Sequence, residues 1–319
     1  MLTACVVLLI ARMITAQDPR GPDAVLMTTL VVMAYPLFFY TSGTLYPQTL
    51  SAFLFVLALS LLLRRGHCWP GDLAAGLVFG YLILVVPTFL LTLFVVLAVA
   101  GVLRIIRWRQ AAIVLVAAGF IVCLWTARNF AVFHQFVPVA SNSGENLLIG
   151  NCENTSPTGG SGNVDRTHYE AEARARGLDE FQTDRYYRDA ALKWIAADPG
   201  RALALYLEKT ANFFNVYNQY APENKGEVTP WKQAVAGATY VLLLALLLWR
   251  MAEWRRFPLT TQEIFFLAVY VLSAFTMAVF VTRIRYRLPY DYLIVAIVAA
   301  HLQRRLASWL VAGPLTKST

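Results

Sequence analysis

Residues 73–103 read LAAGLVFGYLILVVPTFLLTLFVVLAVAGVL, an apolar run of 31 positions without a charged side chain. A transmembrane helix needs about 20 apolar residues to cross a hydrocarbon core of about 30 Å. The run is therefore too long for one upright helix and only just long enough for two short ones. Pro87 lies near its middle, where it interrupts helical hydrogen bonding. The stretch predicts two short helices, or a re-entrant hairpin, that leave one face of a membrane and return to it.

Further apolar segments flank this run on both sides. They cover residues 2–14, 24–40, 48–63, 111–127, 234–249, 264–281 and 288–302. The whole chain is 58% hydrophobic and only 14% charged, with a mean hydropathy of +0.54, which lies outside the usual range of soluble globular proteins. We therefore expect an all-α fold, a polytopic transmembrane helical bundle of about nine membrane segments.

Three parts of the chain differ in composition. Residues 1–127 form the N-terminal part of the predicted bundle, 128–232 are hydrophilic, and 233–319 contain the last membrane helices. Within the hydrophilic part, apolar positions of residues 179–197 recur at helical spacing. Asp198 followed by Pro199 is typical of a helix start, which predicts a second helix there. We expect a large, mostly helical loop domain.

Arginine clusters predict the orientation of the chain, because loops rich in Lys and Arg stay on the cytoplasmic side. The clusters are Arg64 with Arg65, then Arg104, Arg107 and Arg109, then Arg250, Arg255 and Arg256, and then Arg304 with Arg305. With a hairpin at Pro87 all of them lie inside, and residues 128–232 are extracytoplasmic. That segment has 13 acidic and 11 basic residues, whereas the rest of the chain has a net charge of +10. The positive charge thus indicates orientation in a cell (inner) membrane and gives no case for nucleic acid binding.

Arg283, Arg285 and Arg287 fall on the outer side, where the charge rule disfavours them. An anionic ligand such as a lipid phosphate would explain three cations at this boundary. The alternative is that they reach outer headgroups or pair with acids of the loop. On a helix Arg283 and Arg287 would share a face, but Pro289 favours an extended or irregular path around Arg287.

The start of the hydrophilic part is rich in residues that form turns and bind polar ligands. Amides of Asn142, Asn146 and Asn151, with Gly144 between them, could hold a sugar or a phosphate at the membrane surface. The alternative is a chain reversal without a ligand. No nucleophile elbow, zinc-protease motif, phosphate loop or dinucleotide fingerprint is present, and neither the histidines nor the cysteines have metal-ligand spacing. We expect no metal or cofactor, and the catalytic residues stay unassigned.

Several short motifs together resemble one family. They are Tyr35-Pro36, Tyr46-Pro-Gln-Thr-Leu50, Trp125-x-x-Arg128-Asn129, Phe136-Val-Pro-Val139, Ser141-Asn142-x-Gly144-x-Asn146, Gly150-Asn151 and Arg285-Tyr-Arg-Leu-Pro289. In order and spacing they resemble bacterial GT-C glycosyltransferases related to protein O-mannosyltransferases and aminoarabinose transferases.

The resemblance implies an integral membrane enzyme that transfers a sugar from a polyprenyl-phosphate donor to a glycan, lipid or protein acceptor on the outer face. Under it, the lipid phosphate would be bound by Arg128, Arg283, Arg285 and Arg287. The donor loop would comprise Asn129, Asn142, Gly144, Asn146 and Asn151.

This chain departs from the family in its early acids. Family members carry catalytic carboxylates in an outer loop after the first membrane helix, but Asp18, Asp23 and Asp72 are predicted to be cytoplasmic here. We expect that an N-terminal portion with the catalytic loop is missing. Three functions therefore stay open: a glycosyltransferase that is incomplete as written, a noncatalytic protein that binds a polyprenyl lipid or assists a partner, and a transporter. The transporter ranks last, because the predicted spans between residues 111 and 281 carry no pair of acidic residues.

Overall fold

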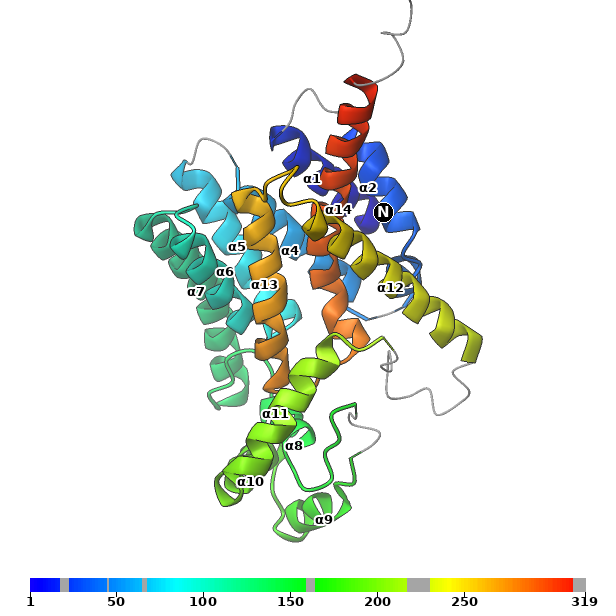
Figure 1. Ribbon diagram of the computed structural model, residues 1–319. Coiled ribbons are helices and arrows are strands. Elements are labelled where there is room, and N and C mark those ends of the chain that lie inside the picture. Colours follow the sequence, from blue (N-terminus) through cyan, green and yellow to red (C-terminus); the bar gives the residue numbers. More distant parts are fainter. Residues whose placement is uncertain (18–22, 45, 65–67, 159–163, 217–229, 312–319) are drawn as a thin grey trace, which may run out of the picture.

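The structure is a computed structural model that describes residues 1–17, 23–44, 46–64, 68–158, 164–216 and 230–311. Arg65 and Asp18, named above, lie outside the described residues. The described residues form helices and no strand, as predicted for an all-α chain. In Figure 1 the long apolar helices form a bundle, and α8 to α11 lie together at one end of it. The helices are α1 (Leu2–Gln17), α2 (Ala24–Met33), α3 (Leu37–Ser42), α4 (Gln48–Leu62), α5 (Trp69–Val85), α6 (Phe89–Val102), α7 (Trp108–Phe133), α8 (Ser143–Gly150), α9 (Thr167–Ala175), α10 (Glu180–Ala197), α11 (Pro199–Phe213), α12 (Pro230–Ala252), α13 (Thr261–Ala278) and α14 (Ile284–Val311).

Among the described residues, four helices are long and apolar enough to cross a membrane, which by length and composition indicates a membrane protein. They are α7, α12, α13 and α14, with candidate spans at Trp108–Phe133, Ala234–Ala252, Thr261–Ala278 and Ile284–Leu310. The other apolar helices, α1, α2, α4, α5 and α6, have 10–17 residues. These are shorter than the roughly 20 residues that an upright span requires.

The apolar run of residues 73–103 forms two helices, α5 and α6, so the predicted break at Pro87 is confirmed. Helix α5 runs parallel to α7: Gly76 packs against Val114, whereas Gly80, one turn later, packs against Ala118. A Cβ atom on Gly76 would lie 2.6 Å from the Val114 carbonyl oxygen, which explains why a residue without a side chain is required. Since α5 and α7 point in the same direction, α6, which connects them in the sequence, runs in the opposite direction.

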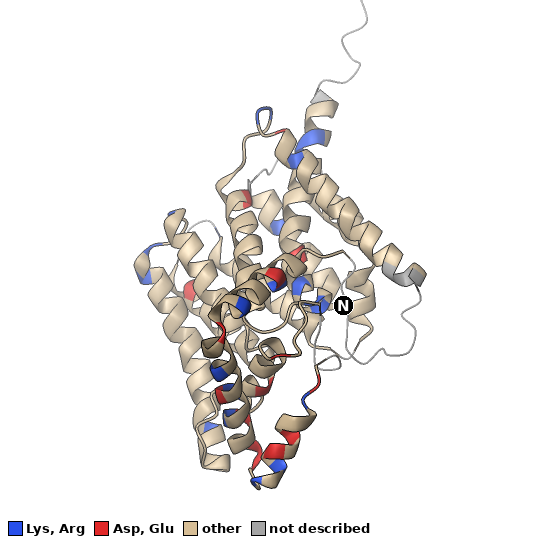
Figure 2. Ribbon diagram, turned by 60° about the horizontal axis from the view of Figure 1, so that its bottom comes forward, with Lys and Arg blue, Asp and Glu red and all other residues tan. Residues whose placement is uncertain are grey.

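The two ends of the bundle can be told apart from contacts. One small pocket is lined by residues from the starts of α4 and α14, the end of α13 and the turn between α5 and α6. We call this end, where α8 to α11 also lie, the loop end. The opposite end therefore holds the ends of α4, α6 and α14 and the starts of α5 and α13. The described arginines of the four clusters belong to segments at this basic end, whereas Figure 2 shows the acidic residues gathered mainly in the α8–α11 part.

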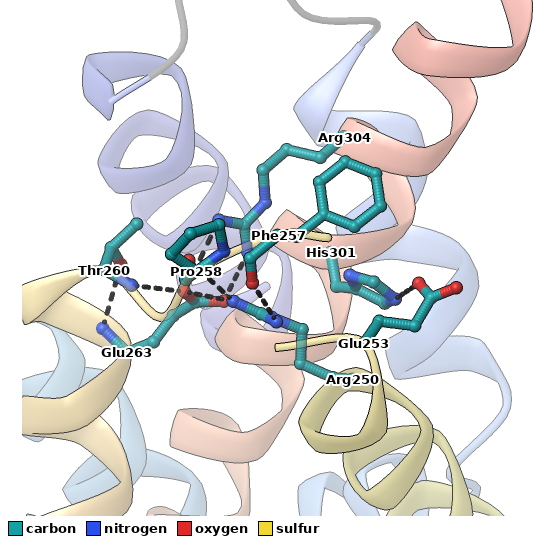
Figure 3. Close-up of polar contacts among 8 residues, drawn as sticks. All are labelled: Arg250, Glu253, Phe257, Pro258, Thr260, Glu263, His301 and Arg304. Atoms are coloured by element: carbon teal, nitrogen blue, oxygen red, sulfur yellow. Dashed lines mark hydrogen bonds and ion pairs between the residues drawn. The ribbon is translucent and has the colours of Figure 1, made fainter. Parts of the chain in front are cut away.

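A buried ion-pair network joins three helices at the basic end (Figure 3). Arg250 of α12 is fully buried and donates from Nε to Oε1 of Glu263 at 2.8 Å and from Nη2 to Oε2 at 2.9 Å. Arg304 of α14 donates to the same carboxylate. Glu263 also accepts from the backbone N–H of Thr260 at 2.9 Å, which caps the start of α13. One carboxylate of α13 thus pairs with two arginines, which the sequence analysis had used only to predict the orientation of the chain.

The sequence and the structure differ at residues 24–40. One span was predicted there, but α2 ends at Met33 and the short α3 begins at Leu37. Pro36 explains the break, because a proline cannot donate the hydrogen bond that would continue the helix. Tyr35 therefore leaves the helix and enters the core, where it is 1% exposed.

We predict that Glu263→Gln destabilises the folded protein by about 3–5 kcal/mol, because it leaves two arginines at a buried site without a counter-charge. The measurement is thermal unfolding in detergent, followed by tryptophan fluorescence. Glu253→Gln is the matched control, since the partly exposed Glu253 also faces His301 and Arg305 at this end. A melting temperature of Glu263→Gln equal to that of the control would contradict the role given to Glu263.

Candidate functional site

The predicted arginine cluster lies where α14 begins, at the loop end of the bundle. Arg283 directly precedes the helix and Arg287 is in its second turn, so the expected extended path around Arg287 is wrong. Pro289 lies inside α14 and leaves one carbonyl of the first turn without its helical partner. Side-chain contacts of Arg287 and Asp291 to other elements outweigh this loss. Arg283 and Arg287 are buried, whereas Arg285 is half-buried.

Arg287 forms a buried ion pair with Asp291 one turn further along α14. The two side chains are 1% and 0% exposed, and Nε of Arg287 lies 3.3 Å from the carboxylate. Nη1 of Arg287 donates to the carbonyl oxygens of Phe213 and Asn215, each at 3.0 Å. Asp291 and the two carbonyl oxygens thus hold the Arg287 guanidinium within the fold.

Three tyrosines complete the surroundings of this ion pair. The hydroxyls of Tyr35 and Tyr270 donate to the two carboxylate oxygens of Asp291 at 3.0 and 3.1 Å. The guanidinium of Arg287 stacks on the ring of Tyr240, 3.5 Å from its centre, and Tyr240 is hydrogen-bonded to Tyr270. The pair therefore joins the α2–α3 junction, α12 and α13 to α14. The sequence analysis did not predict these contacts, because the contacting residues are up to 256 positions apart in the chain.

Arg283 and Arg285, unlike Arg287, have side-chain nitrogens without a hydrogen-bond partner among the described residues. Arg283 is 3% exposed, yet its Nη1 and Nη2 atoms have no hydrogen-bond partner among the described residues. Arg285 stacks between the rings of Tyr46 and Tyr286 and donates from Nη2 to the Tyr286 hydroxyl at 2.8 Å, while its Nε has no partner within the described chain. Two cations with unpartnered nitrogen atoms therefore lie two residues apart in the chain, on either side of the first residue of α14.

A small pocket opens beside Arg285. Apolar side chains form much of its wall, and Gln48, Ser51 and Thr88 add polar groups. The full lining is Gln48, Ser51, Val86, Thr88, Phe89, Met277, Arg285, Tyr286, Pro289 and Tyr290. No carboxylate is among these described residues, so nothing in the lining neutralises Arg285. The pocket combines a cation with apolar walls at the end of a candidate membrane span.

Helix α11 holds the segment that leads into the arginine cluster. Lys209, 1% exposed, donates from Nζ to the carbonyl oxygens of Gly150 at 2.7 Å and Phe280 at 3.0 Å. Asn212 donates from Nδ2 to the carbonyl oxygen and the hydroxyl of Thr282, both at 3.0 Å. Thr282 in turn donates to the carbonyl of Lys209 at 3.0 Å. These contacts fix the backbone directly before Arg283, and neither Lys209 nor Asn212 was distinguished by the sequence.

The predicted donor-loop residues around α8 make contacts within the protein. The Gly144 N–H donates to Asp184 at 2.7 Å, and a Cβ atom there would lie 1.9 Å from the Asp184 carbonyl oxygen. Asn146 donates to the carbonyl oxygen of Asn142 at 2.9 Å. Asn151 is buried, donates to the carbonyl of Val279 at 3.0 Å and accepts from Lys209 at 3.2 Å. Asn151 alone of these residues reaches the connection to α14.

Arg128 and Asn129 lie at the end of α7, away from this connection. Arg128 is exposed and lies over the rings of Trp125 and Phe133. Asn129 is buried and donates to the Val137 carbonyl at 3.0 Å, which holds the following segment against α7. Of the predicted phosphate ligands, Arg283 and Arg285 therefore keep unpartnered nitrogen atoms in the described structure, Arg287 is paired with Asp291, and Arg128 lies over two aromatic rings at the end of α7. No group of three metal-binding side chains occurs in the part of the chain that the structure describes.

We predict that Lys209→Met lowers the free energy of unfolding by at least about 2 kcal/mol, because buried oxygens of Gly150 and Phe280 lose their donor. Burial lowers the pKa of Lys209 to about 8, whereas the unfolded chain keeps a value of about 10.4. The unfolded state then binds more protons between these values, so the stability contributed by Lys209 rises as the pH is raised through them.

The measurement is thermal unfolding of wild type and Lys209→Met from pH 7 to about pH 10. Lys193→Met, at an exposed position of α10, is the matched control. The difference in melting temperature between wild type and Lys209→Met should widen as the pH rises. A difference that narrows would contradict the prediction, because it would show that the hydrogen bonds of the charged ammonium outweigh the cost of its burial.

Comparison with known proteins adds no family to this geometry. No known family, no curated protein and no solved structure matches the chain. The arrangement at the start of α14 is therefore the basis on which a function is proposed.

Proposed function

We propose that this chain is a multi-pass membrane protein of GT-C glycosyltransferase type that binds the phosphate of a polyprenyl-phosphate-linked sugar on the outer face of the membrane. The observation that carries the proposal is the guanidinium of Arg283, which is buried two residues before Arg285 and has both terminal nitrogens unpartnered in the described structure. A buried charge without a counter-charge costs several kcal/mol. A phosphate would supply that counter-charge, and its oxygens match the planar fork of a guanidinium.

The place of the two arginines favours a lipid as the source of the phosphate. They flank the first residue of α14, whose candidate membrane span begins at Ile284. The adjoining pocket is small, but Val86, Phe89 and Met277 among its lining residues give the place beside Arg285 an apolar border. A polyprenyl phosphate has both parts, an anionic head and a hydrocarbon tail. The resemblance to GT-C enzymes adds the sugar and an acceptor glycan, lipid or protein.

The proposed topology has about nine membrane segments, with residues 128–232 extracytoplasmic. Its support is the clustering of the described arginines at the basic end, since cytoplasmic boundaries carry excess Lys and Arg. The hairpin of α5 and α6 allows this arrangement, because it returns the chain to the basic end before α7 begins. Under this topology the membrane is the cell (inner) membrane, and the pocket opens near its outer face.

A noncatalytic polyprenyl-lipid-binding or accessory protein is the second candidate. It is favoured by the lack of a carboxylate among the described residues that line the pocket. Asp291 is engaged by Arg287, and Glu145 pairs with Arg166, so neither acid is positioned there as a base. Inverting sugar transfer needs such a base to activate the acceptor. Turnover of a glycosyl polyprenyl phosphate by the protein would favour the enzyme over this second candidate.

We predict for the topology that a cysteine at position 193 reacts with a membrane-impermeant maleimide in intact cells. The variant Lys193→Cys is made in a background in which Cys5, Cys68, Cys123 and Cys152 are replaced by serine. Arg255→Cys in the same background is the control at the basic end, and it should react only after the cells are permeabilised. The reverse labelling pattern would contradict the proposed orientation.

We predict for the ligand that Arg283→Gln/Arg285→Gln weakens binding of farnesyl phosphate at least about tenfold. Charge-assisted hydrogen bonds contribute about 1.5–3 kcal/mol each, so the loss of two corresponds to more than one decade of affinity. Arg283→Lys/Arg285→Lys should restore part of the affinity, because lysine keeps the charge but lacks the planar fork.

The measurement is equilibrium binding to protein in phosphatidylcholine nanodiscs. Arg109→Gln, at the basic end, is the matched control for the removal of a positive charge. Equal affinity in wild type, in the double glutamine variant and in this control would remove the arginines from the ligand site and, with them, the main support for the proposed function.

A further inference from the structure

Gln48 is a second unsatisfied polar group in the pocket beside Arg285. It is the first residue of α4 and only 4% exposed, and it lines the pocket together with Arg285 and Tyr286. Its side-chain oxygen Oε1 is buried and accepts no hydrogen bond from any described residue. Ser51, which also lines the pocket, donates instead to the backbone oxygen of Gln48 at 3.0 Å, and the buried hydroxyl of Thr49 has no partner among the described residues. One residue of the pocket lining thus has a buried, neutral acceptor without a donor among the described residues.

An acceptor and a cation in one pocket make different demands on a ligand. The Nε of Arg285 needs an acceptor, which an ionised phosphate oxygen supplies. Gln48 Oε1 needs an N–H or O–H donor, which an ionised phosphate cannot supply, because its oxygens carry only lone pairs. With the amide in this orientation, a phosphate alone would leave the Oε1 atom of Gln48 buried and without a donor, at a free-energy cost comparable to that of a lost hydrogen bond.

We infer that the pocket selects a phosphodiester whose second ester group carries a hydroxyl next to the phosphate, as a glycosyl phosphate does, and that Gln48 accepts from this hydroxyl. The inference rests on the proposed function and adds a specificity-determining residue to it. Arg283 and Arg285 bind the anion whatever is attached to it. Gln48 distinguishes a hydroxyl-bearing diester from one that lacks a hydroxyl.

Two lipids share this chemistry, a glycosyl polyprenyl phosphate and phosphatidylglycerol. The glycerol headgroup of the second also places hydroxyls next to a phosphodiester. The experiment therefore compares probes of equal charge: glucosyl farnesyl phosphate, methyl farnesyl phosphate, which lacks any hydroxyl, and phosphatidylglycerol. Each is titrated into wild type, Gln48→Met and Arg285→Gln in phosphatidylcholine nanodiscs.

The expected result is that wild type binds glucosyl farnesyl phosphate about three- to tenfold more tightly than methyl farnesyl phosphate, the range that one neutral hydrogen bond gives. Gln48→Met should remove this preference and leave the affinity for the methyl diester unchanged, since methionine has nearly the same shape without the amide oxygen. Arg285→Gln should weaken both ligands and keep their ratio. Phosphatidylglycerol binding that equals or exceeds that of the glucosyl probe would assign the pocket to a membrane phospholipid and overturn the glycosyl assignment.

The failure of this inference differs from the failure of the proposed function. Equal affinity of wild type for the glucosyl and methyl diesters, together with weaker binding by Arg285→Gln, would overturn the role of Gln48 and leave the phosphate site standing. A glucosyl preference that persists in Gln48→Met would also overturn it, since another group would then recognise the hydroxyl. If Arg285→Gln binds every probe as wild type does, both proposals fail.

Discussion

The ion pair between Arg287 and Asp291 is the interaction on which the rest of the structure depends. A buried pair is stable only when hydrogen bonds satisfy its remaining atoms. Here these bonds come from distant parts of the chain: the Tyr35 and Tyr270 hydroxyls for the carboxylate, and the Phe213 and Asn215 carbonyls for the guanidinium. The pair therefore fixes how the α2–α3 junction, the end of α11, α13 and α14 meet. Loss of one partner would leave the other charge unsatisfied in a core that otherwise consists largely of apolar side chains.

The charge pattern along α14 explains why Arg287 has a counter-ion and Arg283 has none in the described structure. Arg287 is followed four residues later by Asp291, whereas the residue four positions after Arg283 is Arg287 itself. Arg283 thus has a like charge where Arg287 has a counter-ion, and the segment before it is fixed by Lys209 and Asn212 of α11. The backbone cannot readily swing Arg283 into solvent without breaking these bonds. An unsatisfied cation is held in place by the same contacts that join α11 to the bundle.

The sequence was sufficient for the coarse fold and insufficient for the site. Length of the apolar run and Pro87 predicted α5 and α6, and Asp198 with Pro199 predicted the start of α11, because these signals are local. The pairing of Tyr35, Tyr240 and Tyr270 with Arg287 was beyond reach, because it depends on how remote helices pack. Lys209 gave no signal, since a lysine on an amphipathic helix is usually solvated. The sequence analysis assigned Gly144 to a ligand-binding turn. In the structure a glycine is required there because the backbone of Asp184 packs directly against it.

The lengths of neighbouring helices have a consequence for the lipid around the protein. With a rise of 1.5 Å per residue, the 17 residues of α5 extend about 25 Å and the 14 residues of α6 about 21 Å, whereas the 26 residues of α7 extend about 39 Å. A hydrocarbon core of about 30 Å is matched by none of them. Under the proposed topology, lipid beside α5 and α6 would thin, and beside α7 either the lipid would thicken or the helix would tilt, an elastic response to hydrophobic mismatch. The thinned lipid would then lie beside the α5–α6 turn, which lines the same pocket as the start of α14.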